Sequence, residues 1–440
     1  MLHTMQIKLY SSNMGVISFL LLFFSFSALS QPSNNGEVST DASEKLIRTG
    51  VLFDGESIRE NWVIHIKDGL ITYAGPASEY TGTGDILEID LTEQFVMPGL
   101  IDAHTHVLLH PYDETSWNDQ VLIESSAERV ARATNHVRAT LQAGFTTIRD
   151  LGSEGSAYDD VGIREAIEKG VIPGPRMLVA GRAIVATGSY GPKGFAGHVN
   201  VPKGAEEADA GTLAKVVRDQ IGHRIDLVKV YADYRWGPQG QARPTFSQDE
   251  LNLIVEISNL SGRSVVAHAA TAEAMTMAAL AGVRTIEHGD GATRDVYRVM
   301  KEHDVALCPT LAAAESVESY NGWIKGTDPD PARITKKKEA FILALQMGVT
   351  MLAGGDAGVF DHGDNALELE LMVEYGMEPI DVLHAATAVN ADYLDIKGVT
   401  GRISAGLAAD VIAIDGNPAK HITDLRNVSF VMKEGVIYRK

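Results

Sequence analysis

Five short apolar segments of this chain end at a histidine, lysine or aspartate, and this pattern constrains the fold more than any other feature. The segments are FVMPGLIDAHTH with His104 and His106, DLVKVYADY with Lys229, RSVVAHA with His268, RTIEHGD with His288 and TMLAGGDAG with Asp356. Runs of β-branched and aliphatic residues of this length are typical of buried strands. In a barrel of parallel strands, the carboxyl ends of all strands meet at one mouth. The pattern therefore predicts a barrel with a metal centre at that mouth.

Strand-like and helix-like segments alternate along the middle of the chain. Eight apolar runs are expected to be strands, and they are 95–103, 146–150, 176–181, 226–231, 264–268, 284–288, 305–310 and 349–355. The segments 120–143, 271–281 and 332–347 between them have helical patterns, and each is followed by a glycine, as helices often are. Eight such repeats favour an α/β fold of the (β/α)8 TIM-barrel type over an open doubly wound sheet.

The segments on either side of this strand–helix alternation have a different pattern. They alternate apolar and polar residues, as strands with one exposed face do. Residues 45–98 and 396–440 both carry Asp-Gly or Glu-Gly turn signals between such runs. We therefore expect a small β-sandwich domain built from both chain ends, around a barrel formed by residues 99–395. At 440 residues, the chain is long enough for both.

Residues 1–30 have the pattern of a secretory signal peptide, and residues 31–44 that of a polar linker. Lys8 precedes an apolar run at 16–24, and Ser30 is the expected last residue of the peptide. The apolar run is shorter than the ~20 residues that a spanning helix needs, so cleavage is favoured over the alternative of a membrane anchor. We expect an exported protein, periplasmic or secreted, with no stable membrane anchor after cleavage.

Composition limits the partners and the covalent cross-links. The 58 acidic and 38 basic residues give a formal net charge of -20, and no Lys/Arg-rich block offsets it. Nucleic-acid binding needs such a basic surface, so no nucleic-acid partner is expected. Cys308 is the only cysteine, which excludes an intramolecular disulfide, and its apolar neighbours predict a buried structural thiol.

The histidines and the aspartate at the strand ends can share one metal site. His104 and His106 are two residues apart, and residues i and i+2 of a strand point to the same face. His268 and His288 end consecutive expected strands, while Asp356 ends the eighth strand, which adjoins the first in a closed barrel. A carboxylate at that place can bind a metal and accept a proton from water. Hydrogen-bonded core histidines and a helix-capping aspartate are the alternatives.

Lys229 is the unusual member of the set, because a lysine inside an apolar strand needs a partner or a chemical change. An ammonium group has no lone pair for a metal. An ion pair with Asp226 or Asp233 is one interpretation. The other is a carbamate formed with carbon dioxide, whose two oxygens can bridge two metal ions about 3.5–4 Å apart. Among four histidines and an aspartate, we favour the bridge.

These residues together resemble the binuclear branch of the amidohydrolase superfamily. The surrounding motifs PGLIDAHTH, GFTTIRDLG, AGVRTIEHG, GGDAG and GRISAGLAADVIAIDGNP resemble those of imidazolonepropionase-like amidohydrolases. That group includes metal-dependent dipeptidases of the Xaa-Pro and Xaa-Arg/Lys type. The resemblance covers about residues 45–440 and implies a TIM barrel.

The resemblance also implies two divalent metal ions, with zinc the expected metal, although manganese and cobalt suit the same ligands. The first ion would be held by His104, His106 and Asp356 and the second by His268 and His288, with carboxylated Lys229 bridging both. A bridging hydroxide would attack the substrate carbonyl, and Asp356 would pass the proton to the leaving nitrogen. Tyr231 would hydrogen-bond the developing oxyanion, with a packing role as its alternative.

Two loops depart from the dipeptidase-like pattern. Relatives carry TGGHG after the third strand, where this chain has TGSYG at 187–191, and they carry a glycine-rich turn after the lysine strand, where it has YADYRWGPQGQARPTFS. Both loops are expected at the barrel mouth, where a substrate is gripped. Candidate substrate contacts, each with an ordinary loop residue as its alternative, are Arg182, Tyr190, His198, Tyr234, Arg235 and Trp236.

We therefore predict an exported binuclear amidohydrolase that cleaves a small-molecule amide, in a dipeptide or an N-acyl amino acid. The alternatives are a hydrolase of cyclic amides such as imidazolones, a phosphotriester or lactone hydrolase, and a non-catalytic barrel scaffold. Lys229 argues against the first, because imidazolonepropionases are mononuclear, and the complete ligand set argues against the last. The chain is compatible with a homo-oligomer.

Overall fold

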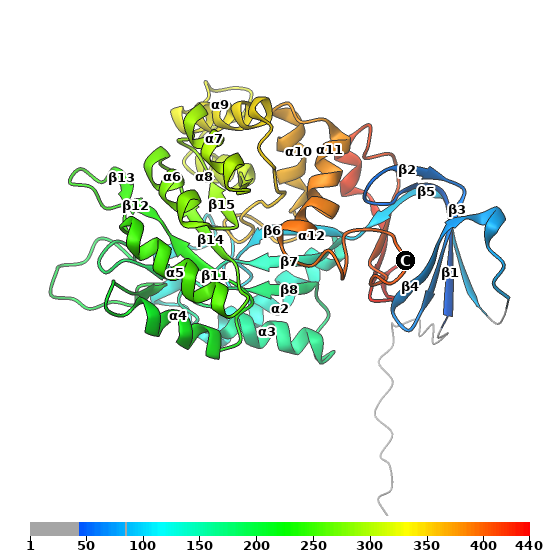
Figure 1. Ribbon diagram of the computed structural model, residues 1–440, viewed down its shortest axis with the longest axis horizontal. Coiled ribbons are helices and arrows are strands. Elements are labelled where there is room, and N and C mark those ends of the chain that lie inside the picture. The colour runs from blue at the N-terminus through cyan, green and yellow to red at the C-terminus, as the bar shows by residue number, and fades with distance from the viewer. Residues whose placement is uncertain (1–43, 84–85) are drawn as a thin grey trace, which may run out of the picture. The chain divides into compact units, whose positions relative to one another are not determined.

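The computed structural model describes residues 44–83 and 86–440 (Figure 1). The expected signal peptide and the linker up to residue 43 lie outside these ranges. Within them, no helix combines the length and the apolar character that crossing a membrane requires.

Both ends of the described chain contribute to one mixed sheet. Its strands are β1 (Glu44–Phe53), β2 (Ile58–Glu60), β3 (Trp62–Lys67), β4 (Leu70–Pro76), β5 (Leu87–Pro98), β17 (Val411–Ile414), β18 (Val428–Lys433) and β19 (Val436–Arg439). Their order is β19-β18-β17-β5-β1-β3-β4, with β2 paired to β1. The two ends meet where β17 pairs antiparallel with β5. The joint sheet was expected, and the sandwich form of the domain stays a prediction.

The middle of the chain forms two sets of parallel strands. One sheet contains β6 (Leu100–Thr105), β7 (Phe145–Asp150) and β8 (Arg176–Val179). The other runs in the order β10 (Glu206–Glu207), β9 (Ile184–Val185), β11 (Val228–Tyr231), β14 (Val265–Ala269), β15 (Thr285–His288) and β16 (Ala306–Cys308). Six expected strands form within two residues of their predicted bounds. A short hairpin, β12 (Asp233–Arg235) with β13 (Ala242–Pro244), follows the lysine strand.

The first expected strand, 95–103, is wrong in its extent, because the chain changes sheets inside it. Residues up to Pro98 belong to β5 of the terminal sheet, and the parallel strand β6 begins at Leu100. Gly99 lies between them, and a Cβ built there would be 2.0 Å from the Thr146 hydroxyl oxygen. Proline lacks the N–H that a continued ladder needs, and only glycine fits the close approach.

The eighth expected strand, 349–355, does not form a regular strand. The segment makes isolated parallel bridges instead, from Met351 to Leu307 of β16 and from Ala357 to Thr105 of β6. The Ala353 N–H donates to the Asn390 side chain rather than to a neighbouring strand. The segment nevertheless runs where the sequence placed it, between β16 and β6.

Helices follow most of the parallel strands and lie around them in Figure 1. They are α1 (Trp117–Leu122), α2 (Ser126–Gln142), α3 (Asp159–Glu168), α4 (Leu213–Gly222), α5 (Gln248–Leu260), α6 (Ala272–Ala281), α7 (Arg294–Glu302), α8 (Leu311–Tyr320), α9 (Ala332–Met347), α10 (Ala366–Glu374), α11 (Pro379–His384) and α12 (Asn390–Tyr393). Short turns of 3-10 or π helix occur at η1 (Ala77–Glu79), η2 (Ala385–Val389) and η3 (Ile422–Arg426).

Local signals explain the helix bounds. The helix expected at 120–143 is divided into α1 and α2, because the Ser125 hydroxyl accepts the Glu128 N–H and starts a new helix. The expected ends of α6 and α9 are confirmed at Gly282 and Gly348, which have φ of 89° and 65°. The apolar faces of the helices and the strands share one large buried cluster.

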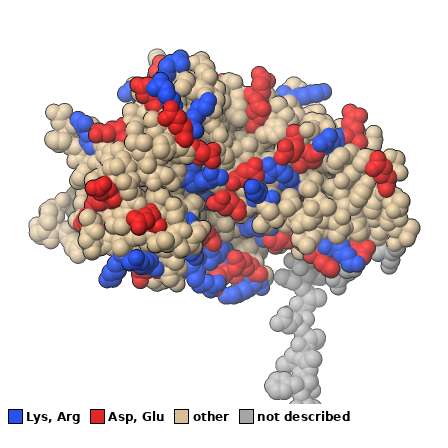
Figure 2. All heavy atoms as spheres, viewed as in Figure 1, with Lys and Arg blue, Asp and Glu red and all other residues tan. Residues whose placement is uncertain are grey.

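Acidic and basic side chains are interspersed on the face of the molecule that Figure 2 shows. Ion pairs among the described residues include that of Arg402 with Asp392 at 2.9 Å.

Asp410 connects the terminal sheet to β8, and its removal should destabilise the fold. Its carboxylate accepts hydrogen bonds at 2.7 Å from Arg176 and Thr400 and at 2.8 Å from the Glu434 N–H. We expect Asp410→Ala to lower the free energy of unfolding by about 3 kcal/mol, because the half-buried guanidinium loses its buried partner. Urea unfolding measures this change. Asp415→Ala in an exposed turn is the control, expected within about 0.5 kcal/mol of wild type; equal stabilities of the two variants would contradict the assignment.

Candidate metal centre

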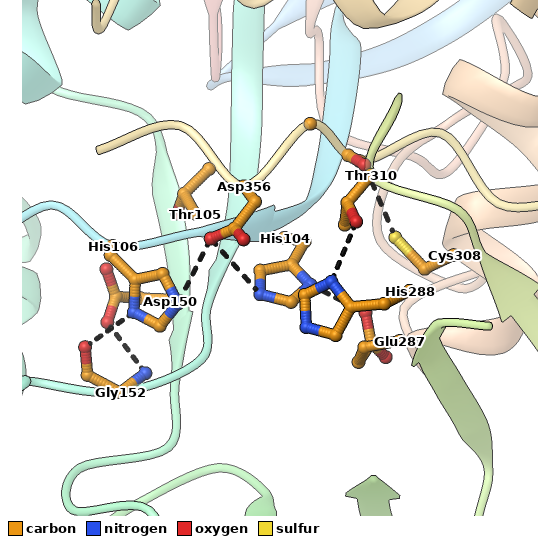
Figure 3. A network of polar contacts seen from close by, with 12 residues as sticks. His104, Thr105, His106, Asp150, Gly152, Glu287, His288, Cys308, Thr310 and Asp356 are labelled. Atoms are coloured by element: carbon orange, nitrogen blue, oxygen red, sulfur yellow. Dashed lines mark hydrogen bonds and ion pairs between the residues drawn. The ribbon is translucent and has the colours of Figure 1, made fainter. Parts of the chain in front are cut away.

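The ends of the parallel strands bring the four expected histidines and Asp356 together. Ring centroids are separated by 5.4 Å for His104 and His106, 5.3 Å for His104 and His288, and 4.4 Å for His268 and His288. One carboxylate oxygen of Asp356 lies 3.5 Å from His104 Nε2 and 3.3 Å from His106 Nε2 (Figure 3). The structure thus brings these five side chains together, and their role as metal ligands stays a prediction.

Three of the histidines have their second ring nitrogen occupied by the protein. His104 Nδ1 donates to Glu287 at 2.8 Å, and His106 Nδ1 donates to the Gly152 carbonyl at 2.9 Å. His288 Nδ1 is hydrogen-bonded to the Thr310 hydroxyl at 2.8 Å. The carboxylate and the carbonyl can only accept, so they fix the tautomers of His104 and His106 and leave Nε2 of each with its lone pair, while the Thr310 hydroxyl fixes the ring orientation of His288.

Burial keeps the imidazoles of His104, His268 and His288 neutral. Burial, assisted by the charge of Lys229, holds the pKa of His104 well below its ordinary value and lowers that of His268 to about 3. Burial and the neighbouring His268 hold the pKa of His288 well below its ordinary value. A neutral imidazole has the lone pair that a metal needs, so the cluster is electrostatically prepared for a cation.

Glu287 supports the cluster and was not singled out from the sequence. Its carboxylate is fully buried and accepts from His104 through one oxygen and from Arg149, at 2.9 Å, through the other. His104, Glu287 and Cys308 also lie within reach of one ion, but the Glu287 oxygens are already engaged. The signal that could have found Glu287 is a carboxylate inside the apolar run RTIEH.

Lys229 is 1% exposed. Among the described residues its ammonium group forms no ion pair or hydrogen bond. Its Nζ lies 5.6 Å from the centroid of the Tyr231 ring. The alternative ion pairs are absent there, since Asp226 pairs with Arg164 and Asp233 accepts from the Thr271 hydroxyl and main chain. Burial lowers the pKa of Lys229.

Cys308 is buried as expected, and burial raises the pKa of its thiol.

Three residues around the cluster have left-handed backbone conformations that side chains other than glycine seldom adopt. The φ angles are 76° at His288, 50° at Thr310 and 66° at Asp356. Such conformations cost of order 1–3 kcal/mol each and persist where the surrounding structure imposes them, which is common at functional sites.

A cavity of about 500 Å³ opens onto the cluster. Of the candidate substrate contacts, Tyr190, Tyr234 and Arg235 line it, as does Tyr231. Its wall also contains residues that the sequence did not single out, namely Tyr112, Trp117, Glu154, Asp290 and Arg333.

The remaining candidate contacts do not line this cavity. Arg182 is turned away to an ion pair with Glu206 at 3.2 Å. His198 lies in an exposed loop. Trp236 is 46% exposed and donates to the Pro244 carbonyl within its hairpin. The structure thus places these three residues outside the cavity lining, because loop residues that are neighbours in sequence need not face the same space.

Comparison with known proteins assigns the family. The model of the amidohydrolase family matches residues 95–438. The chain belongs to the amidohydrolase family. An ochratoxinase of Aspergillus niger is 30% identical over 449 aligned residues, which cover 91% of this chain and 88% of the relative. An imidazolonepropionase of Sphingopyxis alaskensis is 25% identical, with 89% and 93% covered.

A solved structure of a Xaa-Pro dipeptidase with methionine in its active site is similar to this amidohydrolase at a TM-score of 0.81 and 30% identity, covering 90% of this chain and 100% of the other. Its solved structural neighbours are of the TIM-barrel type, in agreement with the α/β class. This amidohydrolase therefore hydrolyses carbon–nitrogen bonds, and its family is metal-dependent.

The donor set fits that dependence. Ligand atoms of His104, His106 and Asp356 lie within 4.8 Å of one another. Imidazole nitrogens with a carboxylate oxygen are ligands that zinc takes in catalytic sites.

Thr310 should tune metal affinity through His288. Thr310→Val keeps the shape and the β-branched character at the left-handed position but removes the hydroxyl that orients Nδ1. We expect metal affinity to fall by about 10–100-fold, as for other lost partners of ligand histidines. Competition with a fluorescent chelator measures this change. Thr335→Val, at an exposed position of α9, is the matched control, and an affinity loss no larger than that of the control would disprove the role.

Proposed function

We propose that this amidohydrolase uses two zinc ions to hydrolyse the amide bond of a dipeptide or an N-acyl amino acid. The observation that carries the proposal is the convergence of four histidines and Asp356 in the lining of one cavity, with the buried Lys229 behind the Tyr231 ring of that lining and in no ion pair among the described residues. The relatives supply the substrate class, since a Xaa-Pro dipeptidase and an ochratoxinase are similar over nine-tenths of this chain.

His104, His106 and Asp356 would hold one ion and His268 and His288 the other, with Lys229 between them. When bound, the ions would polarise the amide carbonyl and lower the pKa of water. The burial of Lys229 supports its proposed role as the bridge. A carbamate forms from a neutral amine, and burial lowers the pKa of this amine. No group among the described residues competes for it by ion pairing.

Asp356 is the proposed proton carrier. Burial raises its pKa above that of an ordinary aspartate, so its carboxylate accepts a proton more readily than an exposed one. The same group would return the proton to the leaving nitrogen, which must be protonated for the C–N bond to break.

Tyr231 is the proposed donor to the oxyanion that develops on the substrate carbonyl. It lines the cavity and stacks on His268 with ring centroids 4.5 Å apart. Burial, with the charge of Glu154, raises its pKa well above the ordinary value, so the phenol keeps its proton at neutral pH. The hydroxyl donates to Glu154 Oε1 over a long 3.4 Å, and this hydrogen bond would give way to one with the oxyanion when a substrate binds.

The cavity also supports a substrate that ends in a carboxylate. Of the described residues in its lining, Arg235 and Arg333 contribute guanidinium groups, which match carboxylates in shape and charge. The phosphotriester and lactone alternatives share the ligands but have no carboxylate for these two arginines.

Two wider proposals accompany the reaction. We propose that the parallel strands close into a (β/α)8 barrel, supported by the hydrogen bond from the Asp226 N–H to the Val179 carbonyl and by the bridges of Met351 and Ala357. We also propose that residues 1–30 direct export and are removed, on the sequence pattern alone.

Metal content tests the binuclear proposal. Elemental analysis of the purified protein should find about two divalent ions per chain. Lys229→Met, which keeps an apolar stem, should bind fewer ions than Lys336→Met at an exposed site of α9. One ion or none in wild type would remove the binuclear mechanism.

Asp356→Asn should reduce turnover by at least about 10²–10⁴-fold, because an amide cannot carry the proton. Steady-state kinetics on hits from a library of dipeptides and N-acyl amino acids measure the loss, with the melting temperature as a check of folding. Asp361→Asn, five residues along in an exposed position, is the control. An Asp356→Asn enzyme with wild-type turnover would disprove the assignment.

A further inference from the structure

Glu154 places a buried carboxylate in the wall of the cavity without a cationic partner. It is 2% exposed, and among the described residues it forms no ion pair. Its partners are neutral donors: Trp117 Nε1 at 3.0 Å and the Tyr190 hydroxyl at 2.7 Å reach Oε2, and the Tyr231 hydroxyl reaches Oε1 at 3.4 Å. Buried charges in proteins are normally paired, and here the Arg129 guanidinium acts on the carboxylate through space without an ion pair, which leaves the carboxylate open to a ligand cation.

The backbone beneath Glu154 is built to hold it there. Arg129 donates to the main-chain carbonyls of Glu154 at 2.8 Å, Ser153 at 3.1 Å and Leu108 at 2.9 Å, and so links the two chain segments. These bonds support a left-handed conformation at Glu154, where φ is 46°. The guanidinium thus contacts the main chain rather than the carboxylate, and a strained conformation is maintained at the cavity wall.

The walls around Glu154 are aromatic. The Tyr190 ring lies 5.3 Å from Trp117, 4.7 Å from Tyr231 and 4.8 Å from Tyr234, measured between centroids. Aromatic faces attract cations, and a carboxylate among them adds an ion-pair partner. The combination suits a ligand ammonium group better than a neutral or anionic one.

Glu154 is also next to the histidine cluster on two sides. A single carbon built on Gly152 would lie 3.3 Å from Glu154 Oε1 and 3.6 Å from the ring of His106. On the other side, Tyr231 contacts Glu154 and stacks on His268. A cation held by Glu154 therefore lies close to the place where the amide reacts. In a peptide, the cation closest to the scissile carbonyl is the α-ammonium group, which is separated from it by one carbon.

We propose that Glu154 binds the free α-ammonium group of the substrate residue that supplies the scissile carbonyl. This inference rests on the proposed function and sharpens it, since it selects dipeptides with a free amino terminus over N-acyl amino acids. Arg235 and Arg333 would then take the opposite, carboxylate end of the substrate.

Paired substrates test the preference. Each dipeptide that wild type hydrolyses is compared with its N-acetyl form, so that the scissile bond is the same. We expect kcat/KM to favour the free dipeptide, and Glu154→Gln to reduce this preference by at least roughly ten-fold, mainly through KM. Glu302→Gln at an exposed site of α7 is the control, in which the preference should persist. The preference is the ratio of two kcat/KM values measured on one enzyme, so a general loss of turnover does not change it. An unchanged ratio in Glu154→Gln, or a wild-type preference for the N-acetyl form, would overturn the inference.

A binding measurement separates this inference from the proposed function. Calorimetric titration compares benzylammonium with benzyl alcohol, which has nearly the same shape but no charge. Wild type should bind the cation more tightly by roughly ten-fold, and Glu154→Gln should bind both alike. If no library amide is hydrolysed, the proposed function fails, while equal binding of the two probes by wild type overturns the role of Glu154.

Discussion

The hydrogen bonds of Glu287 are the interaction on which the rest of the site depends. This buried carboxylate joins His104 of β6, Arg149 of β7 and Thr285 of its own strand β15. A buried carboxylate is stable only when its oxygens are fully engaged, so the network ties three strands into one arrangement. His104 lies between His106 and His288, and its ring orientation therefore sets the geometry of the whole cluster.

The segment that carries Asp356 illustrates how close packing replaces regular structure. A Cβ on Gly354 would lie 2.6 Å from Cys308 Sγ and 2.7 Å from the main-chain nitrogen of His104, so the backbone passes tightly between β16 and β6. Asp102 stabilises this passage, because its buried carboxylate accepts from the His104 N–H and from Asn365. The result is an aspartate held in a left-handed conformation against two imidazoles, which is the geometry that a regular strand would not provide.

The proposed substrate roles divide the cavity by charge. Glu154 lies among aromatic rings beside the histidines, whereas Arg235 and Arg333 contribute the guanidinium groups. An amino terminus and a carboxylate terminus of one short peptide would satisfy both, and an N-acyl amino acid would satisfy only the arginines. Arg235 lies in the loop after the lysine strand, one of the two loops in which the chain departs from its dipeptidase-like relatives, whereas Glu154 follows β7 and Arg333 lies at the start of α9.

Much of the site follows from local sequence alone. The spacing of His104 and His106 puts both on one strand face, and the apolar runs before Lys229, His268 and His288 identify strands within two residues. The break at Gly99, the irregular segment before Asp356 and the displaced Arg182 and His198 were not predictable, because each depends on contacts between distant segments. Glu287 and His104, which are hydrogen-bonded, are 183 residues apart in the sequence. Tyr231 and Glu154, which are also hydrogen-bonded, are 77 residues apart. The sequence by itself determined which side chains end the strands, since alternation and hydrophobicity are local properties. Only the tertiary structure decided which carboxylates support them and which face the substrate, because those pairings arise from burial and close approach across the fold.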